Sequence, residues 1–87
     1  MLRRRGRVGE VVLVTRAGCH LCEQAAPVVA REAARAGVAY AERDVDADPI
    51  DLAAYGEQVP VVLLDGVPHA YWQVDPKALR AALRNGV

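Results

Sequence analysis

The segment Thr15-Arg16-Ala17-Gly18-Cys19-His20-Leu21-Cys22 joins two parts of the chain with different hydrophobic periods. The part before it, residues 10–15, is apolar from Val11 to Val14 and predicts a buried strand. The part after it, residues 20–36, is rich in alanine and repeats its apolar side chains at helical spacing. The two cysteines therefore lie at a helix start, where the partial positive charge of the helix favours a thiolate.

Composition limits the classes of protein to consider. At 87 residues the chain makes one domain with a thin core. We divide it into a basic tail, residues 1–9, and a folded domain, residues 10–87. Eleven basic and eleven acidic residues leave no net charge, so we expect no nucleic-acid partner. The arginine-rich residues 3–7 are interpreted as a tail without a partner, with contact to a nucleic acid or an anionic surface as the alternative. No apolar run reaches the roughly 18 residues of a membrane span, and no signal peptide is recognisable, so we expect a cytoplasmic protein that does not bind membranes.

Downstream of the first helix, the pattern predicts two helices and three strands, the last two of which form a hairpin. Local signals mark their ends: Asp48-Pro49 and Asp75-Pro76 are helix starts, Gly37 is a helix C-cap, and Asp65-Gly66 is a tight hairpin turn. Pro68 places the last strand at a sheet edge. The predicted elements are a strand at 38–45, a helix at 49–55, strands at 59–64 and 67–72, and a helix from 76 to about 84, which gives the order β-α-β-α-β-β-α.

Helical spacing also predicts which side chains face the sheet. Pro27 interrupts the first helix and should kink it. The inward side chains of the first helix are Cys22, Ala25, Ala26, Val29, Ala33 and Ala36, and the solvent-facing ones are Gln24, Arg31 and Arg35. In the last helix the inward side chains are Ala78, Leu79, Ala82 and Leu83, and the outward ones are Lys77, Arg80 and Arg84.

Taken together, these motifs resemble the thioredoxin superfamily, specifically its glutaredoxin-like branch of small bacterial proteins. The resemblance rests on Cys19-His20-Leu21-Cys22 after the first strand, Val59-Pro60 at the third, and the Asp65-Gly66 hairpin before a last helix. Pro27 also matches the helix-kinking proline of thioredoxins. The resemblance implies an α/β thioredoxin fold, with a four-stranded mixed sheet flanked by helices.

The same resemblance implies roles for the motif residues. Cys19 would be the exposed nucleophile and Cys22 the buried resolving thiol. Val59-Pro60 would be a cis peptide bond beside the cysteines, and the backbone before the proline would pair with the extended backbone of a thiol substrate. Arg16 occupies the position where glutaredoxins carry a basic residue.

One region departs from glutaredoxins. They carry Gly-Gly after the fourth strand and then a polar pair that holds the glutamyl end of glutathione. Here the corresponding residues are Trp72-Gln73 and Val74-Asp75, of which only Asp75 is retained in kind. We expect Val59, Pro60, Trp72 and Asp75 to contact substrate. The expected partner is a disulfide-containing protein or a low-molecular-weight thiol, with glutathione or another thiol as possible reductant and no bound cofactor.

Several residues near the dithiol have more than one interpretation. Arg16 and His20 could stabilise a Cys19 thiolate, or they could be a solvated charge and a residue of the first helical turn. Trp72 could form an apolar lip beside the dithiol or simply pack at the last strand with Tyr71. The cysteines and His20 lack zinc-finger spacing and His69 is far along the chain, so we expect no metal site.

The functional prediction is a monomeric thiol-disulfide oxidoreductase. Two alternatives come from other classes of protein. The first is a thioredoxin-fold redox-sensing or binding module without turnover, and the second is a metal or iron–sulfur carrier. The intact cysteine pair together with Val59-Pro60 favours the oxidoreductase, because a pure adaptor has no need of them.

Overall fold

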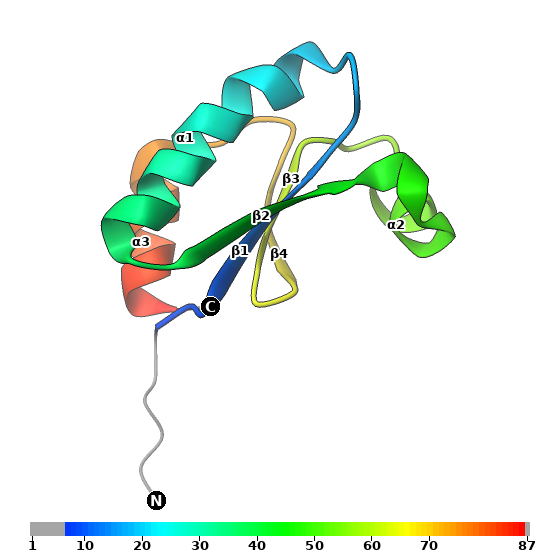
Figure 1. The fold of residues 1–87 in the computed structure, drawn as a ribbon. Coiled ribbons are helices and arrows are strands. Elements are labelled where there is room, and N and C mark those ends of the chain that lie inside the picture. Colours follow the sequence, from blue (N-terminus) through cyan, green and yellow to red (C-terminus); the bar gives the residue numbers. More distant parts are fainter. Residues whose placement is uncertain (1–6, 87) are drawn as a thin grey trace, which may run out of the picture.

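Four strands form one mixed sheet, with helices on both of its faces (Figure 1). The computed structural model describes residues 7–86. Its elements are β1 (Glu10–Thr15), α1 (His20–Ala36), β2 (Ala39–Asp44), the short 3₁₀ helix η1 (Val45–Ala47), α2 (Pro49–Tyr55), β3 (Val61–Leu64), β4 (Val67–Tyr71) and α3 (Pro76–Asn85). The sheet order is β2-β1-β3-β4, with β1 and β2 parallel and the other pairs antiparallel. This is the predicted α/β thioredoxin fold.

The two central strands supply both halves of the core. Side chains alternate between the two faces of a strand, so each uninterrupted apolar run serves two layers. On one face Val11 and Leu13 pack with α1 and α3, and on the other Val12 and Val14 pack beneath η1 and α2. In the register, Val14 pairs with Val61, which places the ends of β1 and the start of β3 side by side. The segments leading into both cysteines and into Pro60 therefore meet at one end of the sheet.

Local chemistry ends the elements as the sequence predicts. Gly37 caps α1 in the left-handed conformation, with φ of 71°. The Asp48 and Asp75 carboxylates accept the backbone N–H groups of the second helical residue, at 2.7 and 2.9 Å. Asp65 and Gly66 both have positive φ, as a two-residue hairpin turn requires. Asp65 also accepts the N–H groups of Gly9 and Glu10, which ties the hairpin to the start of β1.

Some predictions of side-chain orientation and element length are wrong. Ala78 is exposed although helical spacing placed it inward. Arg80 does not simply face solvent, because it pairs with the fully buried carboxylate of Glu32 across the α1–α3 contact. The predicted strand 38–45 is shorter at both ends, since Val38 precedes β2 and Val45 begins η1.

Two further predicted strands are also shorter. Val59 and Pro60 lie before β3, and Trp72 lies beyond β4.

Pro27 lies inside α1, which continues past it to Ala36.

The boundary of the basic tail can be followed only in part. Residues 1–6, which include its first arginines, lie outside the described residues. Val8, which the division at residue 10 assigns to the tail, is 4% exposed and packs in the core against the α1–α3 side of the sheet. Within residues 7–86, none of the helices has the length and apolar character needed to cross a bilayer.

Candidate redox site

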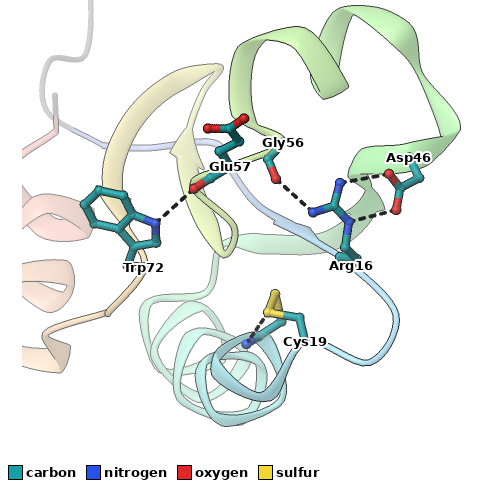
Figure 2. The surroundings of a disulfide bond; sticks show 7 residues. Arg16, Cys19, Asp46, Gly56, Glu57 and Trp72 are labelled. Atoms are coloured by element: carbon teal, nitrogen blue, oxygen red, sulfur yellow. Dashed lines mark hydrogen bonds and ion pairs between the residues drawn. A yellow bond between two sulfur atoms is a disulfide. The ribbon is translucent and has the colours of Figure 1, made fainter.

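Cys19 and Cys22 form a disulfide at the start of α1 (Figure 2). β1 ends at Thr15, and the chain turns through Gly18, whose φ is 77°. A left-handed backbone conformation of this kind is open to glycine without steric cost. The turn is closed by the Cys19 N–H, which donates to the Arg16 carbonyl at 3.2 Å. Cys19 then caps α1, which brings its Cα to 5.2 Å from that of Cys22.

The two sulfurs differ in their surroundings. Cys22 is 2% exposed and packs against the sheet, whereas Cys19 is partly exposed on the outer side of the first turn. The Cys22 N–H points at the Cys19 sulfur, 3.1 Å away. A donor in that position also stabilises a thiolate once the disulfide is reduced. Cys19 is therefore the more accessible cysteine of the pair, and Cys22 lies behind it.

Arg16 connects three segments around the dithiol instead of pointing at a sulfur. Its Nε and Nη2 donate to the two oxygens of Asp46, each at 2.9 Å, and its Nη1 donates to the Gly56 carbonyl at 2.8 Å (Figure 2). The guanidinium holds the pKa of Asp46 below its ordinary value through this hydrogen-bonded pair. Within residues 7–86, no hydrogen bond joins the Arg16 side chain to either cysteine. Arg16 therefore braces the loop before Cys19 against η1 and the end of α2.

His20 lies on the exposed side of the first turn of α1. Its Nε2 is 3.2 Å from the side-chain nitrogen of Gln24, one helical turn further on. The described contacts pair this ring with Gln24 and not with a cysteine. Stabilisation of a thiolate by Arg16 or His20 stays a prediction from sequence.

The Val59–Pro60 peptide bond is cis. Pro60 is buried, Val59 is partly exposed, and the Pro60 carbonyl accepts the backbone N–H of Trp72 at 2.8 Å. Because β3 pairs with the end of β1, this segment lies at the same end of the sheet as the turn into Cys19. The structure thus places Val59 and Pro60 at the end of the sheet that carries the cysteine pair, and their contact with a substrate stays a prediction.

Trp72 has an unusual conformation that sequence reasoning missed. Its φ is 65°, its side chain is largely exposed, and its indole Nε1 donates to the Glu57 carbonyl at 3.2 Å (Figure 2). A positive φ at a large residue is uncommon and strained, so the surrounding contacts must hold it. The indole thereby bridges the loop after β4 and the loop after α2. The sequence shows a tryptophan where glutaredoxins carry glycine, which could have drawn attention to this position. It gives no sign that the indole bonds to the Glu57 carbonyl.

The fixed indole borders two surface hollows. One of about 290 Å³ lies toward α1 and is lined by Leu21, Gln24, Val28, Trp72 and Val74, among others. The second, of about 580 Å³, lies toward α2 and is lined by Leu52, Ala53, Gly56, Glu57 and Trp72, among others. Exposed apolar side chains therefore line both hollows, with Leu21 in the first, Leu52 in the second and Trp72 between them.

The Asp75 carboxylate serves as the N-cap of α3. Its Oδ1 accepts the Lys77 N–H at 2.9 Å, and its carboxylate sits at the start of α3. Any contact of Asp75 with substrate stays a prediction. Among the described residues, no group of three or more His, Cys, Asp or Glu side chains gathers in a way that could hold a metal ion.

The sheet order, the helices on both faces and the cysteine pair at the start of α1 define a thioredoxin-fold protein with a Cys-x-x-Cys motif. Residues 10–84 match the family described as "Glutaredoxin-like domain (DUF836)". The chain therefore belongs to this glutaredoxin-like family of the thioredoxin superfamily.

Similar sequences and structures agree with that assignment. Protein Rv0508 of Mycobacterium tuberculosis and protein Mb0520 of Mycobacterium bovis are each 42% identical over 77 residues, covering 83% of this chain and 79% of theirs. The crystal structure of the structural-genomics target XcR50 from X. campestris is similar, with a TM-score of 0.68 and 34% identity over 84% of this chain and 93% of that one. Fasciola hepatica thioredoxin has a TM-score of 0.60 and 26% identity, covering 91% of this chain and 80% of its own. The family and the fold support a redox function in general terms.

Proposed function

We propose that the protein is a thiol-disulfide oxidoreductase that works through Cys19 and Cys22. The observation that carries the proposal is the asymmetric pair at the start of α1, with Cys22 buried and Cys19 within reach of solvent. The Cys22 N–H directed at the Cys19 sulfur supports Cys19 as the nucleophile. We assign the protein to a reducing compartment, the cytoplasm, where a lone cysteine pair is more often catalytic than structural.

The exchange proceeds in two steps that conserve electrons. The Cys19 thiolate attacks one sulfur of the substrate disulfide, so that a mixed disulfide forms and the other substrate sulfur leaves as a thiolate. Cys22, after losing its proton, then attacks the Cys19 sulfur and releases the second substrate thiolate. Both substrate sulfurs end reduced, and the protein ends as the Cys19–Cys22 disulfide. An external thiol reductant, either two molecules of glutathione or one molecule of a dithiol, returns the two electrons.

Protein disulfides are the substrates that the site favours. Trp72 stands where glutaredoxins carry glycine, and its bond to the Glu57 carbonyl keeps the indole in place. Asp75, the one retained polar position for the glutamyl end of glutathione, is bound to the Lys77 N–H. An extended polypeptide could instead place apolar side chains in the hollows on either side of Trp72.

Turnover distinguishes an enzyme from a module that only records the redox state. The wild-type protein, kept reduced by a chemical thiol, should reduce a disulfide-bonded protein catalytically. Cys19→Ser should abolish this activity, and Ala17→Ser, in the exposed turn before the pair, serves as a control that keeps both cysteines. A protein that forms its own disulfide but never turns over substrate would be a redox-sensing module. Visible absorption that depends on Cys19 and Cys22 would instead indicate a metal or iron–sulfur carrier.

The choice of substrate needs a second comparison. Catalytic efficiency should be higher on a disulfide-bonded protein than on a glutathionylated peptide, with both reactions recycled by the same reductant. A strong preference for the glutathionylated peptide would leave the oxidoreductase assignment intact and contradict the proposed substrate class.

A further inference from the structure

Four arginines surround a hollow at the opposite end of α1 from the dithiol. The hollow has a volume of about 240 Å³ and is lined by Arg7, Arg35, Arg80 and Arg84, with Glu32 and Leu83 also in its wall. Arg35 lies in the last turn of α1 and Arg84 in the last turn of α3. A helix rises by about 1.5 Å per residue, so roughly 24 Å of α1 separates Arg35 from Cys19. Figure 1 shows the C-terminal ends of α1 and α3 together, away from the loop that enters α1.

The positive charge of the arginines around this hollow exceeds the negative charge that the described residues place beside them. Each helix C-terminus carries about half a negative charge, and the two ends together therefore balance about one arginine. Glu32 balances a second arginine, namely Arg80. Counted over residues 7–86, about two of the four positive charges remain. Among residues 7–86, the ion pairs of the structure include Arg80 but none of Arg7, Arg35 and Arg84.

A buried carboxylate holds one of these guanidinium groups in position. The Glu32 side chain is fully buried, and its two oxygens accept Arg80 Nε at 2.9 Å and Nη2 at 2.8 Å. This leaves Nη1 of Arg80 without a hydrogen bond to any described residue. Arg80 and Arg84 lie four residues apart, so they project from the same side of α3. An orientation fixed in advance lowers the entropic cost of binding an anion.

We propose that the arginine hollow binds a small molecule through a phosphate or pyrophosphate group. The planar guanidinium fork matches phosphate oxygens in a bidentate way, which is why arginine predominates in phosphate sites. A phosphate group carries close to two negative charges at neutral pH, which matches the excess of about two positive charges. The concave shape of the hollow favours a small ligand over the extended backbone of a nucleic acid.

Calorimetric titration of the full-length protein with inorganic pyrophosphate tests this proposal. Arg35 and Arg84 are exposed, so the double variant R35Q/R84Q should fold normally. We expect one pyrophosphate per chain, with affinity that falls as salt is added, because exposed charges are screened. Losing two charge-assisted contacts should weaken binding by about tenfold or more. The matched control is K77Q, which removes a positive charge from the same helix outside the hollow and should bind like the wild type.

Several results would overturn the proposal. They are no binding of pyrophosphate by the wild-type protein, unchanged affinity in R35Q/R84Q, or an equal loss in K77Q. Binding of a single-stranded oligonucleotide without any binding of pyrophosphate would identify the arginines as a nucleic-acid surface instead. None of these readouts depends on disulfide exchange, so the result is separate from the fate of the proposed function.

Discussion

Replacing Asp75 separates its role as a helix cap from its predicted role in substrate contact. In the structure its carboxylate accepts the Lys77 N–H at 2.9 Å and stands at the positive end of α3. Asp75→Ala removes both the acceptor and the charge, and loss of an N-cap typically costs about 1 kcal/mol, within a range of roughly 0.5–2. For a domain of this size, a loss of about 1 kcal/mol lowers Tm by roughly 4–8 °C. Asp75→Asn keeps an acceptor oxygen and loses only the charge, which is worth about 0.3–1 kcal/mol at an exposed helix start.

The expected order of Tm is therefore wild type, Asp75→Asn and then Asp75→Ala, measured by circular dichroism on the oxidised protein. The same variants are then assayed at a temperature where all are folded. Asp75→Asn should retain turnover of a protein disulfide, because the carboxylate is engaged by the cap. An unchanged Tm in Asp75→Ala, or equal losses in both variants, would refute the capping argument. A loss of turnover in Asp75→Asn at nearly unchanged Tm would show that the charge contacts substrate.

Three other substitutions test the core, the buried ion pair and the tryptophan. Leu79→Ala empties a fully buried site between α3 and the sheet, so it should cost about 2–5 kcal/mol in urea unfolding, and a smaller loss would mean that the core closes over the gap. Arg80 lowers the pKa of Glu32 from its ordinary value of 4.5. The ion pair therefore stabilises the folded state at a pH above the pKa that Glu32 has in the unfolded chain. This stabilisation is lost as the pH falls through the lower pKa that Glu32 has in the folded protein. The urea midpoint of the wild type should fall more steeply on acidification than that of Glu32→Gln, and parallel curves would contradict the linkage. Trp72→Gly suits the φ of 65° at this position and removes the indole. It should raise catalytic efficiency on a glutathionylated peptide relative to a protein disulfide, and an unchanged ratio would show that the indole does not select substrate.

The features that could be predicted from sequence are those fixed by neighbouring residues. The apolar run of β1 identified a central strand because few other places in a small domain bury both faces of a strand. Asp48-Pro49, Gly37 and Asp65-Gly66 each set a helix end or a turn through local hydrogen bonds or backbone conformation. The position of the cysteine pair followed from the same local signals, since it falls between a strand and a helix.

The side-chain contacts described next, between residues far apart in the chain, could not be predicted. Glu32 lies in an alanine-rich helix and carries no local sign of burial, because its partner Arg80 is 48 positions away. Arg16 and Asp46 are 30 positions apart, and only the folded sheet brings η1 beside the loop before Cys19. The indole bond of Trp72 to the Glu57 carbonyl likewise depends on how two loops meet at the start of β3. Around the dithiol, sequence thus located the cysteine pair but not the contacts that position it.

The most direct test of the proposed chemistry is intact-mass analysis of the reduced Cys22→Ser variant after mixing with a disulfide-bonded protein. The account predicts a stable mixed disulfide through Cys19, because the exposed sulfur can attack substrate and no resolving thiol remains to release it. Reduced Cys19→Ser, treated in the same way, should form little adduct because Cys22 is buried. Absence of an adduct on Cys22→Ser, or faster capture by Cys19→Ser, would contradict the assignment of Cys19 as the nucleophile.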